Sequence, residues 1–206
     1  AWELKKAGLR VTVLEAAPML MGRQLDATAG TILKEIVEKN GTSIPTGVTT
    51  ESIDADESGA VSGVTLQSGE SFPAELVIIS AGVRANTALA KEMGLQVERA
   101  VVVNSHMETG LKNIDACGDC AEYKGANFAI WPEASEQGRI AGANAAGDRL
   151  EYREVSSALT VNGMNSSLYA AGDNGKNPNL LYKTVEFKDM GKEQYRKYYF
   201  LNNRLC

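Results

Sequence analysis

The sequence predicts an α/β fold. Helix-like and strand-like segments alternate over the first 45 residues, and this order is typical of a sheet covered by helices. Two nearly continuous apolar runs, residues 11–14 and residues 76–79, have the pattern of strands that are buried on both faces. Between these runs, short strand-like pieces separated by turn residues indicate an antiparallel meander.

Helices and strands are expected to alternate in the amino-terminal segment. Apolar residues at helical spacing predict a helix over residues 2–7, which Gly8 ends. The β-branched residues 11–14 predict the first strand. A second helix is expected over residues 28–40, and residues 43–45 are expected to form the next short strand.

The middle of the chain has the spacing of an antiparallel sheet. Residues 52–56, 63–67 and 71–74 are strand-like, and Gly- and Ser-containing turns separate them. Residues 76–79 then return to the pattern of a buried strand.

The rest of the chain mixes helices and strands. Helices are expected over residues 87–92 and 132–146, and the Pro and small residues of the second helix favour close packing on a sheet or ligand. A strand is expected at residues 101–103, and a strand leading into a turn at residues 114–119. Residues 195–206 hold two strand-like runs around an Asn-Asn pair.

Composition excludes several classes of protein. The 206 residues are 44% hydrophobic and 23% charged, which is globular composition. A net charge of −5 provides no basic field for phosphates, so we expect no nucleic-acid partner. No apolar run approaches the roughly 18 residues of a membrane span, and no secretion leader opens the chain, although Ala1 is not a natural start. We expect a soluble, cytoplasmic protein with reduced cysteines.

The cysteines and the histidine give no metal site. His106 is the only histidine, which excludes a multi-histidine centre. Cys117 and Cys120 form a C-x-x-C motif, for which a redox dithiol and half of a zinc site are alternatives to two small structural residues. Zinc would need two further ligands, and only His106 and Cys206 are present, at unpromising spacing.

Glu15 is the first candidate binding residue. An acidic residue that closes the second strand of a βαβ unit can accept hydrogen bonds from the ribose hydroxyls of NAD, and it would repel the 2′-phosphate of NADPH. A solvated glutamate at a strand end is the alternative. The glycine-rich turn that would decide between them is not in this chain, and we expect it before Ala1.

A second motif begins at Thr109. Six residues and the small pair Ala116-Cys117 separate it from Gly118 and Asp119. This stretch resembles the second flavin motif of the FAD-dependent pyridine nucleotide–disulfide oxidoreductases, in the branch that holds NADH oxidases, NADH–rubredoxin reductases and nitrite reductase flavin subunits. A glycine there lets the backbone approach the ligand, and the aspartate can accept hydrogen bonds from the ribityl chain of FAD.

The resemblance covers nearly the whole chain. Residues 80–87 are similar to the segment that leaves the NAD domain, although the family usually has proline where Ala85 stands. Residues 131–139 resemble the helix whose amino end faces the flavin, where unpaired N–H groups and the helix dipole can stabilise negative charge. Catalytic residues stay unknown. The predicted cofactor-binding residues are Glu15, Gly82, Thr109, Gly118, Asp119, Trp131, Pro132, Glu133 and Ala134.

The resemblance also implies a domain organisation. Residues 1–82 would be a partial NAD-binding, Rossmann-like domain that lacks its first strand and glycine turn. Residues 83–150 would be the returning part of the FAD-binding domain, and residues 151–206 the start of an α+β carboxy-terminal domain of the dimerisation type. The chain would then be an internal fragment without the amino-terminal FAD segment.

The implied function is that of an FAD-dependent oxidoreductase. In the full-length protein, a hydride would pass from NADH to FAD and on to an electron acceptor: a small rubredoxin-like protein, a disulfide or oxygen. We expect the isolated fragment to be inactive, and we expect a homodimer or a self-associating fragment. The alternatives are a non-enzymatic interaction module with a dinucleotide-binding-like fold, and a dithiol reductase that uses Cys117 and Cys120. Residues 170–173 repeat the Gly-Asp pair without its threonine and are expected to form a structural turn.

Overall fold

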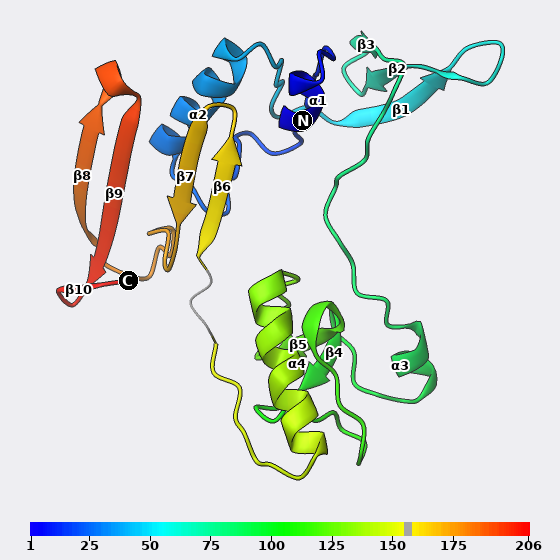
Figure 1. The fold of residues 1–206 in the computed structure, drawn as a ribbon, viewed down its shortest axis with the longest axis vertical. Helices are drawn as coiled ribbons and strands as arrows, with labels where there is room; N and C mark the ends of the chain where they lie inside the picture. The colour runs from blue at the N-terminus through cyan, green and yellow to red at the C-terminus, as the bar shows by residue number, and fades with distance from the viewer. Residues whose placement is uncertain (155–157) are drawn as a thin grey trace. The chain divides into compact units, whose positions relative to one another are not determined.

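The computed structural model describes residues 1–154 and 158–206 and confirms a mixed α/β chain (Figure 1). The chain divides into two compact units. Unit 1 comprises Ala1–Ile79 and Ala158–Cys206, and unit 2 comprises Ser80–Ser157. The division into three domains stays a prediction.

Unit 1 contains the helices and the meander that the first part of the sequence predicts. Both helices lie within two residues of their expected bounds, and the three central strands pair antiparallel in the order β1-β2-β3. Its described elements are α1 (Trp2–Lys6), α2 (Ala27–Lys39), β1 (Thr50–Ala55), β2 (Val61–Leu66), β3 (Ser71–Pro73), β6 (Leu159–Gly163), β7 (Ser166–Ala170), β8 (Lys183–Asp189), η2 (Met190–Lys192), β9 (Gln194–Leu201) and β10 (Arg204–Leu205).

The first predicted strand pairs in parallel with the segment that follows α2. Isolated bridges join Thr12 to Ser43 and Glu15 to Thr46. This pairing places Glu15 at the end of a short extended segment, as the alternation of helices and strands predicts. A core cluster of unit 1 contains apolar side chains from these two segments, from α2 and from two loops: Leu20, Val37 and Ile44, with Val13, Leu33 and Met164 packed against them.

The carboxy-terminal part of unit 1 is built from antiparallel hairpins. Strands β6 and β7 pair with each other, and β8, β9 and β10 form a sheet in the order β10-β9-β8. Between β9 and β10, Asn202 and Asn203 have φ angles of 49° and 60°, the left-handed region that asparagine tolerates in two-residue hairpin turns. The two runs predicted around the Asn-Asn pair are therefore confirmed.

One strand prediction is wrong, and another is reduced to a single bridge. Residues 76–79 are extended but exposed, with Leu76, Ile78 and Ile79 at 63%, 63% and 75% accessibility, and within the described part of the chain no strand pairs with them. An apolar run indicates what a strand can bury, but a strand forms only when another segment supplies its hydrogen bonds. Residues 114–119 form a single bridge, Asp115 to Glu108, before a 3₁₀ turn begins.

Unit 2 packs one long helix against a pair of parallel strands. Strands β4 and β5 pair in parallel, and Ile140 and Ala141 of the long helix belong to the core cluster that contains Val103 and Ala121 of the strands. Its described elements are α3 (Ala88–Glu92), β4 (Val101–Val103), η1 (Gly118–Cys120), β5 (Ala121–Tyr123) and α4 (Trp131–Ala145). Across the described ranges of both units, no helix has the length and apolar character needed to cross a membrane.

Candidate functional site

The turn that carries Gly118 and Asp119 lies directly against the first turns of α4. The Gly118 N–H donates a hydrogen bond of 2.8 Å to Oε1 of Gln137. Gly118 has a φ of +71°, and a Cβ built there would lie 3.3 Å from the Cβ of Ala134. A glycine is required here on both counts, because side-chain-bearing residues rarely adopt this conformation and the helix leaves little room.

Asp119 is held by its backbone while its side chain remains available. The Asp119 carbonyl oxygen accepts a hydrogen bond of 2.9 Å from Nδ2 of Asn127, which also donates to the carbonyl oxygen of Ala121 at 2.8 Å. The Asp119 side chain is exposed, and its carboxylate makes no hydrogen bond or ion pair with any described residue. The site therefore presents two acceptor oxygens on a fixed turn.

Thr109 stabilises the loop that precedes this turn. Its hydroxyl donates to the carbonyl oxygen of Ile114 at 2.7 Å and accepts from the N–H of Leu111 at 3.3 Å. The threonine closes a short loop on itself, as expected of a hydroxyl side chain in a turn. Its observed contacts are all within this loop.

The amino end of α4 is open and apolar. The helix begins at Trp131 with Pro132 in its first turn, and the side chain of its N-cap residue, Ile130, makes no capping hydrogen bond. Trp131 is 85% exposed, and Phe128 and Ile130 beside it are also exposed. Because the N-cap residue offers no side-chain acceptor to the first turn, this end keeps the partial positive charge of a helix amino terminus.

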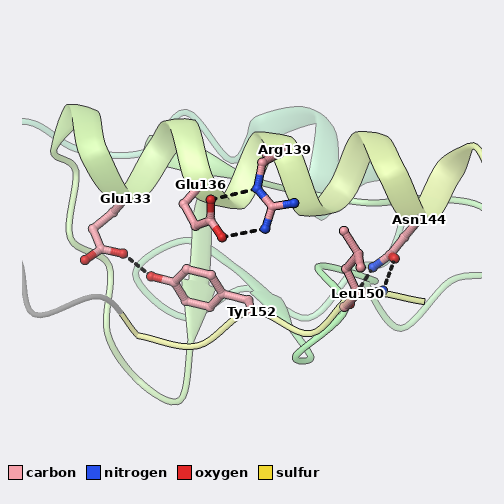
Figure 2. A network of polar contacts seen from close by, with 6 residues as sticks. All are labelled: Glu133, Glu136, Arg139, Asn144, Leu150 and Tyr152. Atoms are coloured by element: carbon pink, nitrogen blue, oxygen red, sulfur yellow. Dashed lines mark hydrogen bonds and ion pairs between the residues drawn. The ribbon is translucent and has the colours of Figure 1, made fainter. Parts of the chain in front are cut away.

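The buried face of α4 carries polar residues beside Ile140 and Ala141, and these are not among the predicted features except for Glu133. Glu133 and Gln137 are 1% and 2% exposed, and Asn144 lies two turns further along the same face. Figure 2 shows Glu133 and Asn144 pointing toward the segment of Leu150 and Tyr152, whereas Glu136 and Arg139 pair with one another. The spacing of these polar residues relative to Ile140 was the available signal, because i, i+4, i+7 and i+11 share one helix face.

Each of these polar residues fastens α4 to another segment. The Tyr152 hydroxyl donates to Oε2 of Glu133. Asn144 donates to the carbonyl oxygens of His106 and Leu150 at 3.0 and 2.9 Å, and accepts from the Leu150 N–H at 2.7 Å. Since the carboxylate of Glu133 is buried in this contact, a cofactor role for Glu133 can rest only on its backbone N–H in the first turn of α4.

Tyr152 keeps its proton over the whole physiological range. Burial, followed by the hydrogen bond to Glu133, raises the pKa of Tyr152 to about 12. Its ring also contacts Tyr123 edge-on, with ring centroids 5.3 Å apart. A neutral phenol that donates to a carboxylate is therefore a permanent part of the unit 2 core.

The other two predicted residues are Glu15 and Gly82. Glu15 belongs to unit 1, where its Oε1 accepts a hydrogen bond of 2.7 Å from the N–H of Ala17. Gly82 belongs to unit 2, is exposed, and has a φ of +89° with nothing near its Cβ position. The structure thus brings together Gly118, Asp119 and the start of α4, but not Gly82.

The C-x-x-C motif has the properties of a structural turn. Cys117 and Cys120 are not bonded to each other, and the Cys120 thiol donates to the Cys117 carbonyl oxygen at 3.2 Å. Burial, with smaller contributions from Cys120 and Asp115, raises the pKa of the Cys117 thiol, which opposes the thiolate that a redox dithiol needs. Within residues 1–154 and 158–206, no group of acidic, Cys or His side chains has the geometry of a metal site.

Comparison with known proteins adds sequence relatives. The chain is 36% identical over 173 residues to nitrite reductase [NAD(P)H] of Bacillus subtilis strain 168, covering 82% of this chain and 21% of the relative. It is 32% identical over 167 residues to the NADH-rubredoxin oxidoreductase of Clostridium acetobutylicum, covering 80% of this chain and 40% of the relative. The chain therefore spans between a fifth and two fifths of the length of these relatives.

Solved structures and a family model agree with these relatives. An FAD-dependent pyridine nucleotide-disulphide oxidoreductase from Desulfovibrio vulgaris superimposes with a TM-score of 0.82 at 27% identity, over 92% of this chain and 50% of that chain. The NADH:rubredoxin oxidoreductase structure from Clostridium acetobutylicum gives a TM-score of 0.73 at 26% identity, over 98% and 48%. A family model described as pyridine nucleotide-disulphide oxidoreductase matches residues 1–138. Since this match covers more than half of the 206 residues, the chain belongs to the pyridine nucleotide-disulphide oxidoreductase family.

Proposed function

We propose that the whole protein is an FAD-dependent oxidoreductase that accepts a hydride from NADH and passes electrons to an acceptor, and that unit 2 supplies part of its FAD site. The observation that carries this proposal is the exposure of the Asp119 carboxylate. Its carboxylate is exposed and unpaired among the described residues, on a turn that Gly118 and Gln137 fix against α4.

The residues of this turn fit the chemistry of a flavin. The ribityl chain of FAD carries hydroxyl donors, and the Asp119 carboxylate offers only acceptors. The uncapped amino end of α4 favours negative charge, which a flavin develops at one edge when it is reduced. FAD, when bound, supplies the hydride-accepting chemistry, while the protein positions it and tunes its surroundings.

Glu15 supports NADH as the reductant. The hydrogen bond from the Ala17 N–H to Oε1 orients its carboxylate at the end of the short extended segment. Its Oε2 has no hydrogen-bond partner in the described part of the chain and is available to ribose hydroxyls. A negative charge at this position disfavours the extra phosphate of NADPH.

The names of the relatives support a small redox protein as the acceptor. Besides the clostridial NADH-rubredoxin oxidoreductase, they include a nitric oxide reductase FlRd-NAD(+) reductase of Vibrio vulnificus. We propose the same class of acceptor here, in a cytoplasmic homodimer. The cytoplasm is favoured by the three free cysteines. The domains proposed are an NAD part in residues 1–82, a returning FAD part in residues 83–150 and a carboxy-terminal part in residues 151–206.

The test is an Asp119→Ala variant of the whole protein. We expect the wild-type protein to carry FAD, measured by its visible absorbance, and to reduce ferricyanide with NADH. The variant should lose most of its FAD, while Asp115→Ala, which removes an exposed acid four residues earlier, should keep it. A wild-type protein without flavin would contradict the proposal and favour the interaction module, and an Asp119→Ala variant with full flavin would remove the assigned role of this carboxylate.

A further inference from the structure

A chain of polar contacts connects the Asp119 turn to the first turn of α4. The Gly118 N–H donates to Oε1 of Gln137 at 2.8 Å. The amide of Gln137 lowers the pKa of the Tyr152 hydroxyl, and this hydroxyl donates a hydrogen bond to the Glu133 carboxylate. The side chains of Gln137, Tyr152 and Glu133 are at most 2% exposed, so water does not compete for these contacts.

The two ends of the Gln137 amide have opposite roles. Its oxygen accepts from the Gly118 N–H, which leaves its NH₂ as the end that can stabilise the Tyr152 oxygen, since the Tyr152 hydroxyl donates to Glu133. The Gln137 amide lowers the pKa of Tyr152 against the opposing effects of burial and Glu133. No other side chain of this length offers both an acceptor and a donor at neutral charge.

We infer that Gln137 is a positioning residue of the cofactor site, an inference that rests on the proposed function. Glu133 lies in the first turn of α4 and Gln137 in the second, so Tyr152 and Gly118 are both tied to the open end of the helix. Gln137 thereby fixes where the Asp119 carboxylate stands relative to the amino-terminal turn of α4. Eleven residues, from Cys120 to Ile130, separate Asp119 from the start of α4 in the chain. Local structure alone therefore does not set the distance between Asp119 and the helix.

The free-energy cost of losing this contact comes mainly from the Gly118 N–H. Removing the acceptor leaves a half-buried donor without a partner, which costs about 1–3 kcal/mol unless the turn shifts to find water. A shift of the turn moves Asp119 with it, because Gly118 and Asp119 are adjacent. Loss of this hydrogen bond therefore changes the geometry of the site and also lowers the stability of the protein.

The test compares Gln137→Met with Asn144→Leu in the whole protein loaded with FAD. Both variants replace an amide with an apolar side chain and remove hydrogen bonds from the same face of α4, but only Gln137 contacts the Asp119 turn. We expect both to lower the melting temperature. Only Gln137→Met should weaken FAD binding, by about tenfold in Kd, which corresponds to about 1.4 kcal/mol, and shift the flavin midpoint potential to a more negative value.

A third variant keeps the test decisive where Gln137→Met fails to fold. Tyr152→Phe preserves the ring but removes the oxygen that orients the Gln137 amide, and we expect a smaller weakening of FAD binding, roughly threefold, with the same direction of potential shift. Unchanged Kd and potential in a folded Gln137→Met variant, or equal changes in Asn144→Leu, would overturn the inference. A failure of the proposed function can be told apart from a failure of this inference, because the wild-type protein would then bind no FAD.

Discussion

Asp26 and Lys197 form an ion pair of 3.0 Å within unit 1, although 171 residues separate them in the chain. Asp26 also caps α2 by accepting the Ala29 N–H at 2.9 Å, and it accepts the Tyr195 hydroxyl at 2.7 Å. One carboxylate thus begins a helix of the amino-terminal segment and fastens strand β9 of the carboxy-terminal segment to it. We expect this residue to hold unit 1 together.

We expect the replacement of Asp26 to destabilise unit 1 more than the replacement of any other exposed or half-buried acidic residue measured in the same way. Asp26→Ala removes the cap and both contacts to β9, and we expect a loss of about 2–3 kcal/mol in the free energy of unfolding. Asp26→Asn keeps the cap and should lose about half as much. The control is Glu186→Gln, which removes the more exposed partner of Lys197 at 3.5 Å and should change stability by less than about 0.5 kcal/mol. Urea unfolding measures all three.

We also expect the Asp26 carboxylate to make the stability of the protein depend on pH in the acid range. Burial alone raises the pKa of Asp26, but the hydrogen bonds from Ala29, Tyr195 and Lys197 together outweigh it and lower the pKa below 3.8. A lowered pKa in the folded state gives stability that is present above about pH 4 and is lost as the pH falls further. We expect the melting temperature of the wild-type protein to drop more steeply below pH 4 than that of Asp26→Asn, and equal slopes would contradict this assignment.

Gly118→Ala tests whether the Gly-Asp turn needs a glycine. The substitution places a Cβ 3.3 Å from that of Ala134 on a backbone with φ of +71°. We expect a loss of about 1–2 kcal/mol in stability and weaker retention of FAD by the whole protein. Gly110→Ala is the matched control, because it lies in the preceding loop with open space around its Cβ position and no positive φ. If both variants retain FAD equally, the close approach of turn and helix is not functional.

Tyr152 predicts a loss of stability at alkaline pH. Its pKa is raised to about 12 from an ordinary value of 10.0, chiefly by burial and then by the hydrogen bond to Glu133. A group whose folded-state pKa is raised contributes stability that is fully present below the unfolded pKa and is lost as the pH rises. We expect stability to fall between about pH 10 and pH 12, and to fall less in Tyr152→Phe, when melting temperatures of both proteins are measured across this window.

The elements that the sequence predicts well are those with a local cause. Helix α2 lies within one residue of the predicted bounds, because apolar spacing and the glycine that follows it are visible in 14 consecutive residues, 28–41. The hairpin around Asn202 and Asn203 follows from two residues that tolerate a positive φ. The Gly118–Asp119 turn is predicted by its spacing from Thr109, which resembles the second flavin motif of the family.

The features that sequence reasoning missed depend on partners far along the chain. Residues 76–79 have the composition of a buried strand, but composition does not say whether another segment pairs with them. Tyr152 was not singled out, because its neighbours give no sign that Glu133 and Gln137, 19 and 15 residues earlier, turn toward it. The Asp26–Lys197 ion pair is the extreme case, since only the folded chain brings these two residues together.

Ile79→Lys should reduce self-association of the 206-residue chain. Residues 76–79 are an exposed apolar run without a strand partner in the described chain, which is the type of segment that pairs with other copies. A charge at Ile79 should lower the apparent mass in sedimentation experiments without lowering the melting temperature. Ser80→Lys adds the same charge at the adjacent exposed position, and an equal effect there would show that net charge, and not the apolar run, is responsible.

The 206-residue chain by itself should retain little or no FAD, even though it carries the Asp119 turn. Its sequence contains no G-x-G-x-x-G turn, and such turns supply the backbone N–H groups that bind the pyrophosphate of a dinucleotide. The contacts proposed here engage the ribityl chain and one edge of the flavin only, so they orient FAD but leave its phosphates to solvent. We expect the whole protein, purified in parallel, to show visible flavin absorbance in proportion to its concentration and the 206-residue chain to show almost none. Stoichiometric flavin in the chain alone would mean that its residues bind the phosphates by a route other than a glycine-rich turn.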